Sequence, residues 1–461
     1  MQHDARGLPL TAATSEAAAC FDATIAAYCG LRKDTGDCLK HTLVADPQFV
    51  MAHLLRGYFM MLFGKRENVP RAKAALSDAD AAIEALGATD RERLHRAALD
   101  AWIAGHLDRA VAHWEAVLLH HPRDLLALKL AQYGTFYQGD SVGMRASTAR
   151  VLHAWDETVP GFGFVLGCHA FGLEESGDYA AAERAGRRAI EINRADVWAA
   201  HAVAHVLEMQ NRTREGIAWV GGLDREWDET NNFVFHIRWH RCLFHLERED
   251  YGRVLDLYDR EVRAEPTDEY LDITNAVALL WRLEHAGVDV GGRWAELRER
   301  ARVRLDDHLL VFADVHYAMA LATADESGMQ TWLKSSTEFA RQRGMLEADV
   351  MAESGLALGE AALAHRRGDH GRVIELLYPR RDSIRRLGGS HAQRDLYEQM
   401  LIDSAIRSRQ NPLARALLSE RLTLRPDNLW GWRQLAALAR ATGDRSALAQ
   451  AEAAAGRILA N

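Results

Sequence analysis

A tight turn between two helices recurs along this chain at regular intervals. Segments that read as a helix end, a turn and a second helix place the turns at Gly105, Gly139, Gly177, Asn211 and Glu249. The intervals are therefore 34, 38, 34 and 38 residues. This period constrains the fold more than composition does, because a unit this short does not bury its own apolar face and must stack on its neighbours.

A 34-residue helix–turn–helix unit is typical of tetratricopeptide repeats, and four extra residues fit a longer loop or helix in alternate units. We therefore predict an all-α fold, a right-handed α-solenoid or superhelix of tetratricopeptide-like repeats. One continuous array is expected over residues 86–461, with later and less regular turns at Gly368, Asn411 and Gly443. Residues 1–85 are expected to form an N-terminal helical region that caps one end of the array.

The composition argues against several classes of partner. Lys and Arg number 56 against 65 Asp and Glu, which gives a net charge of −9, so neither nucleic acid nor a membrane surface is an expected partner. Five cysteines without a Cys-x-x-Cys pair argue against a disulfide framework or a cysteine-type zinc site. The chain starts without a hydrophobic signal core, and no apolar run has spanning length, so a cytoplasmic location is expected.

Histidines are concentrated in the middle of the chain. Helical spacing places His201, His205 and Glu208 in one stripe, ten, six and three residues before the turn at Asn211. In tetratricopeptide proteins these offsets on the first helix of a unit face the concave groove. The next unit contributes His236 and Trp239 from the adjacent first helix, so we expect one imidazole-rich patch at the centre of the groove.

The same count extends the wall of the groove into neighbouring units. It predicts binding residues at Phe171 and Glu174 in one unit and at Tyr133 in another, beside Trp239. His169, His240 and His316 are expected near the patch.

Three interpretations of the patch stay open at this point. Imidazoles four residues apart on a helix can share one metal ion, so His201, His205 and Glu208 are candidate ligands for a divalent metal. A histidine near a glutamate in a partly buried groove also suits acid–base catalysis, for which His201, His205, Glu208, His236 and His240 are the candidates. The third interpretation is that these side chains only pack and form hydrogen bonds between helices.

Several segments, in the right order along nearly the whole chain, resemble the tetratricopeptide repeat protein 38 family. They are Gly7–Thr11, Phe21–Thr24, Ala45–Met51, Trp114–Pro122, His201–Met209, His236–His240, Asp314–His316 and Gly388–Asp395. The resemblance implies a helical-repeat fold and a cytoplasmic location. It implies no particular reaction, substrate or cofactor.

Two functions follow as hypotheses. In the first, the protein is a binding module whose concave groove, lined centrally by His, Trp and Glu, holds a peptide, a protein partner or another ligand. In the alternative, the same groove is the site of an enzyme that performs hydrolytic or acid–base chemistry on a small molecule, with or without a metal. A closed, narrow groove around the histidines favours a small-molecule site, whereas a wide channel favours an extended partner.

Overall fold

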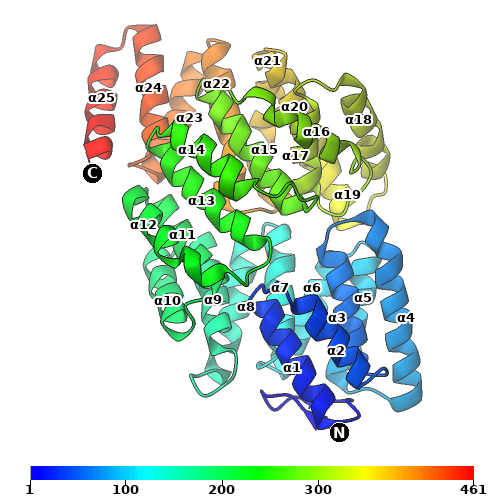
Figure 1. Cartoon of the computed structure of the whole chain (residues 1–461). Helices are drawn as coiled ribbons and strands as arrows, with labels where there is room; N and C mark the ends of the chain where they lie inside the picture. Colours follow the sequence, from blue (N-terminus) through cyan, green and yellow to red (C-terminus); the bar gives the residue numbers. More distant parts are fainter. Residues whose placement is uncertain (1, 461) are drawn as a thin grey trace.

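The computed structural model describes residues 2–460, and it is built almost entirely of α-helices (Figure 1). The first half of the chain contains β1 (Gln2–His3), β2 (Pro9–Leu10), α1 (Ser15–Cys29), α2 (Thr35–Ala45), α3 (Val50–Leu62), α4 (Val69–Leu86), α5 (Asp90–Ile103), α6 (Leu107–His120), α7 (Leu125–Tyr137), α8 (Ser141–Val151), α9 (Phe162–Glu175), α10 (Tyr179–Ile192), α11 (Val197–Met209) and α12 (Thr213–Leu223). The second half contains α13 (Phe233–Glu247), α14 (Tyr251–Leu257), α15 (Tyr270–His285), α16 (Trp294–Arg302), α17 (Val311–Leu321), α18 (Glu326–Ala340), α19 (Leu346–Val350), α20 (Leu356–Arg366), α21 (His370–Leu377), α22 (His391–Arg407), α23 (Asn411–Leu424), α24 (Leu429–Thr442) and α25 (Arg445–Ala460).

Short helical turns and one small hairpin complete the fold. The short turns are η1 (Arg66–Asn68), η2 (Leu152–Ala154), η3 (Asp224–Trp227), η4 (Tyr258–Val262), η5 (Gly291–Arg293), η6 (Met351–Gly355), η7 (Tyr378–Arg380) and η8 (Ile384–Leu387). Strands β1 and β2 pair antiparallel, with Gln2 opposite Leu10. No helix within residues 2–460 combines the length and the apolar character needed to cross a membrane.

The helix pairs follow the predicted phase of the repeat. The backbone is left-handed at all five predicted turn positions, with φ of +86° at Gly105, +66° at Gly139, +82° at Gly177, +55° at Asn211 and +60° at Glu249. Each of these residues separates the first helix of a pair from the second. The prediction of an all-α, right-handed superhelix of tetratricopeptide-like repeats is confirmed.

Later turns follow the prediction with one shift. Gly368 and Gly443 are left-handed, with φ of +74° and +73°. The turn predicted at Asn411 has its left-handed residue two positions earlier, at Arg409, and Asn411 already belongs to α23. Pro412 suits the first turn of that helix, where a backbone N–H has no partner within the helix.

Separate turns of the superhelix touch each other through glycine. The loop after α7 meets the segment that leads into α22, and a Cβ atom built on Gly139 would lie 1.9 Å from the carbonyl oxygen of Arg385. A Cβ on Gly388 would lie 2.6 Å from the Cα of Tyr137. The two backbones can approach this closely because glycine carries no side chain. These contacts join an earlier turn of the superhelix to a later one.

Two carboxylates strengthen the same closure. Glu175, the last residue of α9, accepts a hydrogen bond from the backbone N–H of His391, the first residue of α22, at 3.1 Å. Glu247, the last residue of α13, accepts hydrogen bonds from the side-chain amide of Asn428 at 2.8 Å and from the backbone N–H of Leu429 at 2.5 Å. Each carboxylate therefore caps a helix that lies about one superhelical turn later in the chain, where free N–H groups favour negative charge.

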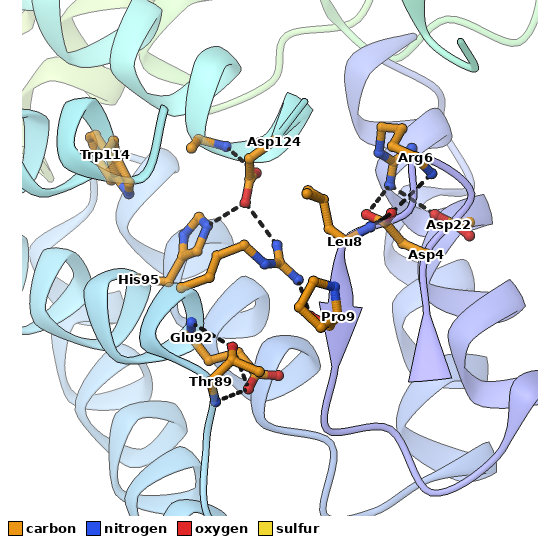
Figure 2. Close-up of polar contacts among 12 residues, drawn as sticks. Asp4, Arg6, Leu8, Pro9, Asp22, Thr89, Glu92, His95, Trp114 and Asp124 are labelled. Carbon is orange, nitrogen blue, oxygen red and sulfur yellow. Dashed lines mark hydrogen bonds and ion pairs between the residues drawn. The ribbon is translucent and has the colours of Figure 1, made fainter. Parts of the chain in front are cut away.

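The N-terminal hairpin is attached to the repeat array through a buried polar network (Figure 2). The carboxylate of Asp124 accepts hydrogen bonds from Arg91 at 2.7 Å and from Nε2 of His95 at 3.1 Å. Arg91 also donates to the carbonyl oxygen of Pro9 in β2 at 3.0 Å. Helix α1 packs against α7, so the N-terminal helices contact the repeat array along an inner helix.

Replacement of Gly388 by alanine tests the closure, and Gly87 provides a matched control. Both glycines have nearly the same backbone conformation, with φ of +78° and +79° and ψ of −161° and −177°. A Cβ on Gly87 meets no atom within 4 Å. We expect Gly87→Ala to lower the free energy of unfolding by about 1–3 kcal/mol through backbone strain alone. Gly388→Ala should cost about 1–3 kcal/mol more, because the backbone of Tyr137 must move away.

Urea denaturation followed by circular dichroism measures the two losses. Equal destabilisation by the two substitutions would show that the contact between superhelical turns contributes nothing to stability.

Candidate functional site

Four histidines from two neighbouring helices converge at the centre of the superhelix. His201 and His205 come from α11, and His236 and His240 come from α13. The Nε2 atom of His201 lies 3.0 Å from that of His236 and 2.9 Å from that of His205. One ring nitrogen from each of the four lies within 4.8 Å of the others. We refer to His201, His205, His236 and His240 as the four-histidine cluster.

The cluster is removed from water, and this decides its charge. The exposed fraction is 2% for His201, 0% for His205 and His240, and 4% for His236. Burial holds the pKa values of His201, His205 and His236 well below the usual range of imidazole, and repulsion from neighbouring histidines lowers them further. These three imidazoles are therefore neutral at pH 7, with lone pairs available for a ligand or a metal.

Polar groups behind the cluster orient its rings. The Nδ1 atom of His240 lies 2.8 Å from Oε2 of Glu208, and that of His236 lies 3.1 Å from Oδ1 of Asn275. Glu208 was predicted to share a metal with His201 and His205, but the structure places its carboxylate against the ring of His240. The group of potential ligands that the structure brings together around His201 and His205 contains His236 and His240 instead.

Two further carboxyl groups lie behind His205. Its Nδ1 atom is 3.5 Å from Oε2 of Glu174 and 4.0 Å from Oε1 of Glu175. Glu174 is fully buried, and neither of its oxygens has a hydrogen-bond partner among residues 2–460. Burial raises the pKa of Glu174 well above its usual value, and the negative charges of Glu175 and Glu208 raise it further.

A cavity of about 690 Å³ lies beside the cluster, inside the superhelix. His201, His205 and His236 form part of its wall, whereas His240 lies behind them. Most of the remaining wall is apolar or aromatic and comes from α1, α2, α3, α7, α9, α11, α13 and α15. Its aromatic members are Tyr28, Phe59, Phe63, Tyr133, Phe136, Tyr137, Phe171, Trp198, Phe233 and Tyr270.

The cavity opens to solvent on the side of the N-terminal helices. The exposed residues of its wall all lie between positions 32 and 63; they are Arg32, Lys33, Gly36, Lys40 and Phe63. Next to this opening, residues 31–33 pair with residues 229–231 across the superhelix. The backbone N–H of Asn231 donates to Leu31 at 2.7 Å, and that of Lys33 donates to Glu229 at 3.0 Å. The N-terminal helices therefore cover the concave face and form the rim of the opening.

Lys129 is the buried cation in the wall of the cavity. Its residue is 8% exposed, and its ammonium lies 3.7 Å from the centre of the Trp198 ring. Within residues 2–460 it forms neither a hydrogen bond nor an ion pair. Asp196 lies nearby, and burial raises the pKa of its carboxyl group to about 6. The positive charge of Lys129 acts in the opposite direction and lowers that pKa, but by less. An acidic group inside the cavity would find an ammonium without a competing ion pair.

The remaining predicted binding residues differ in where they lie relative to the cavity. Phe171 and Tyr133 line the cavity, and the ring of Phe171 lies 5.3 Å from that of His201. Trp239 stacks on His236 from behind, with ring centres 5.5 Å apart. His169 instead contacts Thr148 on α8 at 3.0 Å, and His316 contacts the carbonyl oxygen of Phe312 at 2.7 Å, so neither belongs to the cavity wall.

Sequence reasoning missed two parts of the site. The N-terminal helices were expected only to cap the array, yet Tyr28 and Phe59 face the cavity, and no repeat period extends to them. Asn275 was missed as the partner of His236. The signal that was available is a polar pair, Thr274 and Asn275, directly before the apolar run Ala276–Trp281 of α15.

Fold and site together define the class: an all-α helical-repeat protein with a histidine-lined internal cavity. Comparison with known families finds no matching family model, so the resemblance to the tetratricopeptide repeat protein 38 family stays a prediction. Among solved structures, the chain is similar to one described as the structure of Naa15/Naa10 bound to HypK-THB. The identity is 12%, the TM-score is 0.22, and the match covers 96% of this chain and 64% of that chain. The chain thus spans less than two thirds of that protein, and a likeness this weak carries no information about ligands or partners.

The lowered pKa values predict a particular dependence of stability on pH. Below about pH 6.5 the unfolded chain binds protons that the buried histidines do not, so the free energy of unfolding falls as the pH falls. Each such histidine should account for about 1 kcal/mol of loss between about pH 7 and about pH 5.5. The double variant H201Q/H205Q should therefore lose about 2 kcal/mol less than the unmodified protein over this range.

Urea denaturation at the two pH values, in the presence of a chelator, measures this difference. His120 is exposed, so H120Q is the control and should retain the pH dependence of the unmodified protein. Identical pH dependence in H201Q/H205Q and the unmodified protein would contradict the assignment of neutral, buried imidazoles.

Proposed function

We propose that this protein binds a small, mainly apolar organic acid inside its superhelix. A helical-repeat architecture fits a binding role in general, and the shape of the concave side here favours a small ligand. The observation that carries the proposal is the cavity of about 690 Å³, whose apolar wall contains a few converging polar groups. Cavities of about 300–1,000 Å³ with this kind of wall are typical of small-molecule sites.

The polar groups in the wall indicate the chemistry of the ligand. Lys129 supplies a buried positive charge without an ion-pair partner within the described chain. A carboxylate on the ligand would form that ion pair. The neutral imidazoles of His201, His205 and His236 add nitrogen donors or acceptors on another part of the wall. Ten aromatic residues also line the cavity, and they favour a flat or unsaturated apolar body.

An extended peptide fits this interior less well than a small molecule. The exposed residues of the wall all come from positions 32–63, and the neighbouring residues 31–33 are joined to residues 229–231 by backbone hydrogen bonds. A peptide-binding solenoid usually presents contacts along an open groove, whereas here the polar groups gather inside one cavity. An enzymatic role at the same site would use the same bound acid as substrate, with the histidines as proton acceptors or donors.

Binding of a fluorescent acid and its neutral ester tests the proposal. The probes are pyrenebutyric acid and its methyl ester, titrated into the full-length protein in the presence of a chelator. We expect the acid to bind more tightly than the ester, because only the acid pairs with Lys129. Lys129→Met should weaken binding of the acid by about 10–100-fold and leave the ester unchanged.

Two further variants separate the cavity from the protein surface. Lys40→Met removes an exposed lysine at the opening and should change the affinity for the acid by less than about threefold. Met60→Trp adds bulk to the wall and should weaken both probes. Equal affinity of Lys129→Met and the unmodified protein for the acid, or no binding of either probe, would overturn the proposal.

A further inference from the structure

The four-histidine cluster has the geometry of a metal site. Two histidine pairs, each spaced four residues apart, project from adjacent helices toward one point. The Nε2–Nε2 distances of 3.0 Å and 2.9 Å are close to the about 3.3 Å that separates two nitrogens bound to a tetrahedral ion at 2.0–2.1 Å. These two separations differ from the tetrahedral value by only a few tenths of an ångström, and one ligand atom from each of the four rings lies within 4.8 Å of the others.

Hydrogen bonding alone leaves the cluster incomplete. The Nε2 atom of His201 lies within hydrogen-bond distance of two other Nε2 atoms, yet a neutral ring nitrogen carries either one proton or one lone pair. Nε2 of His240 is buried and has no partner among residues 2–460. Unpaired polar atoms in a dry site cost free energy, whereas one cation accepts a lone pair from every ring.

The surroundings of the cluster match those of a bound cation. Glu208 accepts from Nδ1 of His240 and Asn275 from Nδ1 of His236, which leaves Nε2 of both rings to the centre. Metal-binding histidines usually have such oxygen partners on the nitrogen that faces away from the ion. Glu174 lies behind His205, with Oε2 3.5 Å from Nδ1 of that ring and both oxygens without a hydrogen-bond partner in the described chain, so a cation in the cluster would favour its carboxylate form.

The donor set selects the metal. Four imidazoles without thiolate suit zinc and neighbouring divalent transition metals, whereas magnesium and calcium prefer oxygen. The buried cysteines Cys168 and Cys242 lie outside the group of potential ligands.

We propose that His201, His205, His236 and His240 bind one zinc ion through their Nε2 atoms. Three of the four side chains also line the cavity, so the ion occupies its wall. Glu208 and Asn275 are positioning residues, because they orient ligating rings without contacting the ion. The site stands independently of the organic acid proposed above, since it rests on the cluster and its partners alone.

Metal titration of the full-length chain tests the site. The protein is stripped with a chelator, exchanged into metal-free buffer and titrated with zinc chloride by calorimetry, and its metal content is measured by mass spectrometry. We expect one zinc ion per chain. The double variant H201Q/H205Q should bind zinc at least about 100-fold more weakly, and Glu208→Gln should bind it about 10–100-fold more weakly.

A second group of potential ligands provides the matched control. His285, His365 and Asp403 also lie within 4.8 Å of one another, and none of the three lines the cavity. His365→Gln should retain full zinc binding at the four-histidine cluster. Loss of zinc in His365→Gln with retention in H201Q/H205Q would assign the metal to the other group and overturn the proposal.

Cobalt(II) binding to the unmodified chain decides the question if the double variant fails to fold. Tetrahedral coordination by nitrogen gives an intense visible absorption without the ultraviolet band of a cobalt–thiolate bond. A weak, six-coordinate spectrum, or less than about a tenth of an equivalent of zinc in the reconstituted protein, would reject the site. Failure of the pyrene probes would leave these metal measurements unaffected, because that titration is performed in chelator.

Discussion

Contact between separate turns of the superhelix is the constraint on which the rest of the structure depends. Gly139 and Gly388 permit backbone to lie against backbone, and Glu175 and Glu247 cap helices that belong to a later turn. These contacts bring the inner helices around a shared interior. An open solenoid of the same repeats would leave its inner face in water, whereas this chain buries the four histidines.

Burial of these side chains explains the chemistry of the site. An imidazole in a solvated groove titrates near neutral pH, but the rings of His201, His205 and His236 are held neutral by burial. Neutral rings pack together without mutual repulsion and keep their lone pairs. The same burial leaves both oxygens of Glu174 without a hydrogen-bond partner, and the ammonium of Lys129 has no ion pair in the described chain, so each of them indicates a missing partner.

The sequence was informative where local rules apply. A left-handed turn ends the first helix of each repeat, so the five turn positions and the inward direction of His201 and His205 followed from counting residues. The role of Glu208 did not follow, because a stripe on one helix does not reveal that a ring from the next helix reaches the carboxylate first. The contribution of residues 28–63 to the cavity depends on contacts about 200 residues apart, such as that between Leu31 and Asn231, and no period encodes these.

The placement of the rim has a consequence for kinetics. In a stack of repeats each unit is stabilised mainly by its neighbours, so the terminal units open locally at a lower free energy than the middle of the array. Here the N-terminal helices form the rim of the opening between the cavity and solvent. We expect local opening of these helices to raise the rate at which a molecule enters or leaves, while the helices that carry the histidines remain folded.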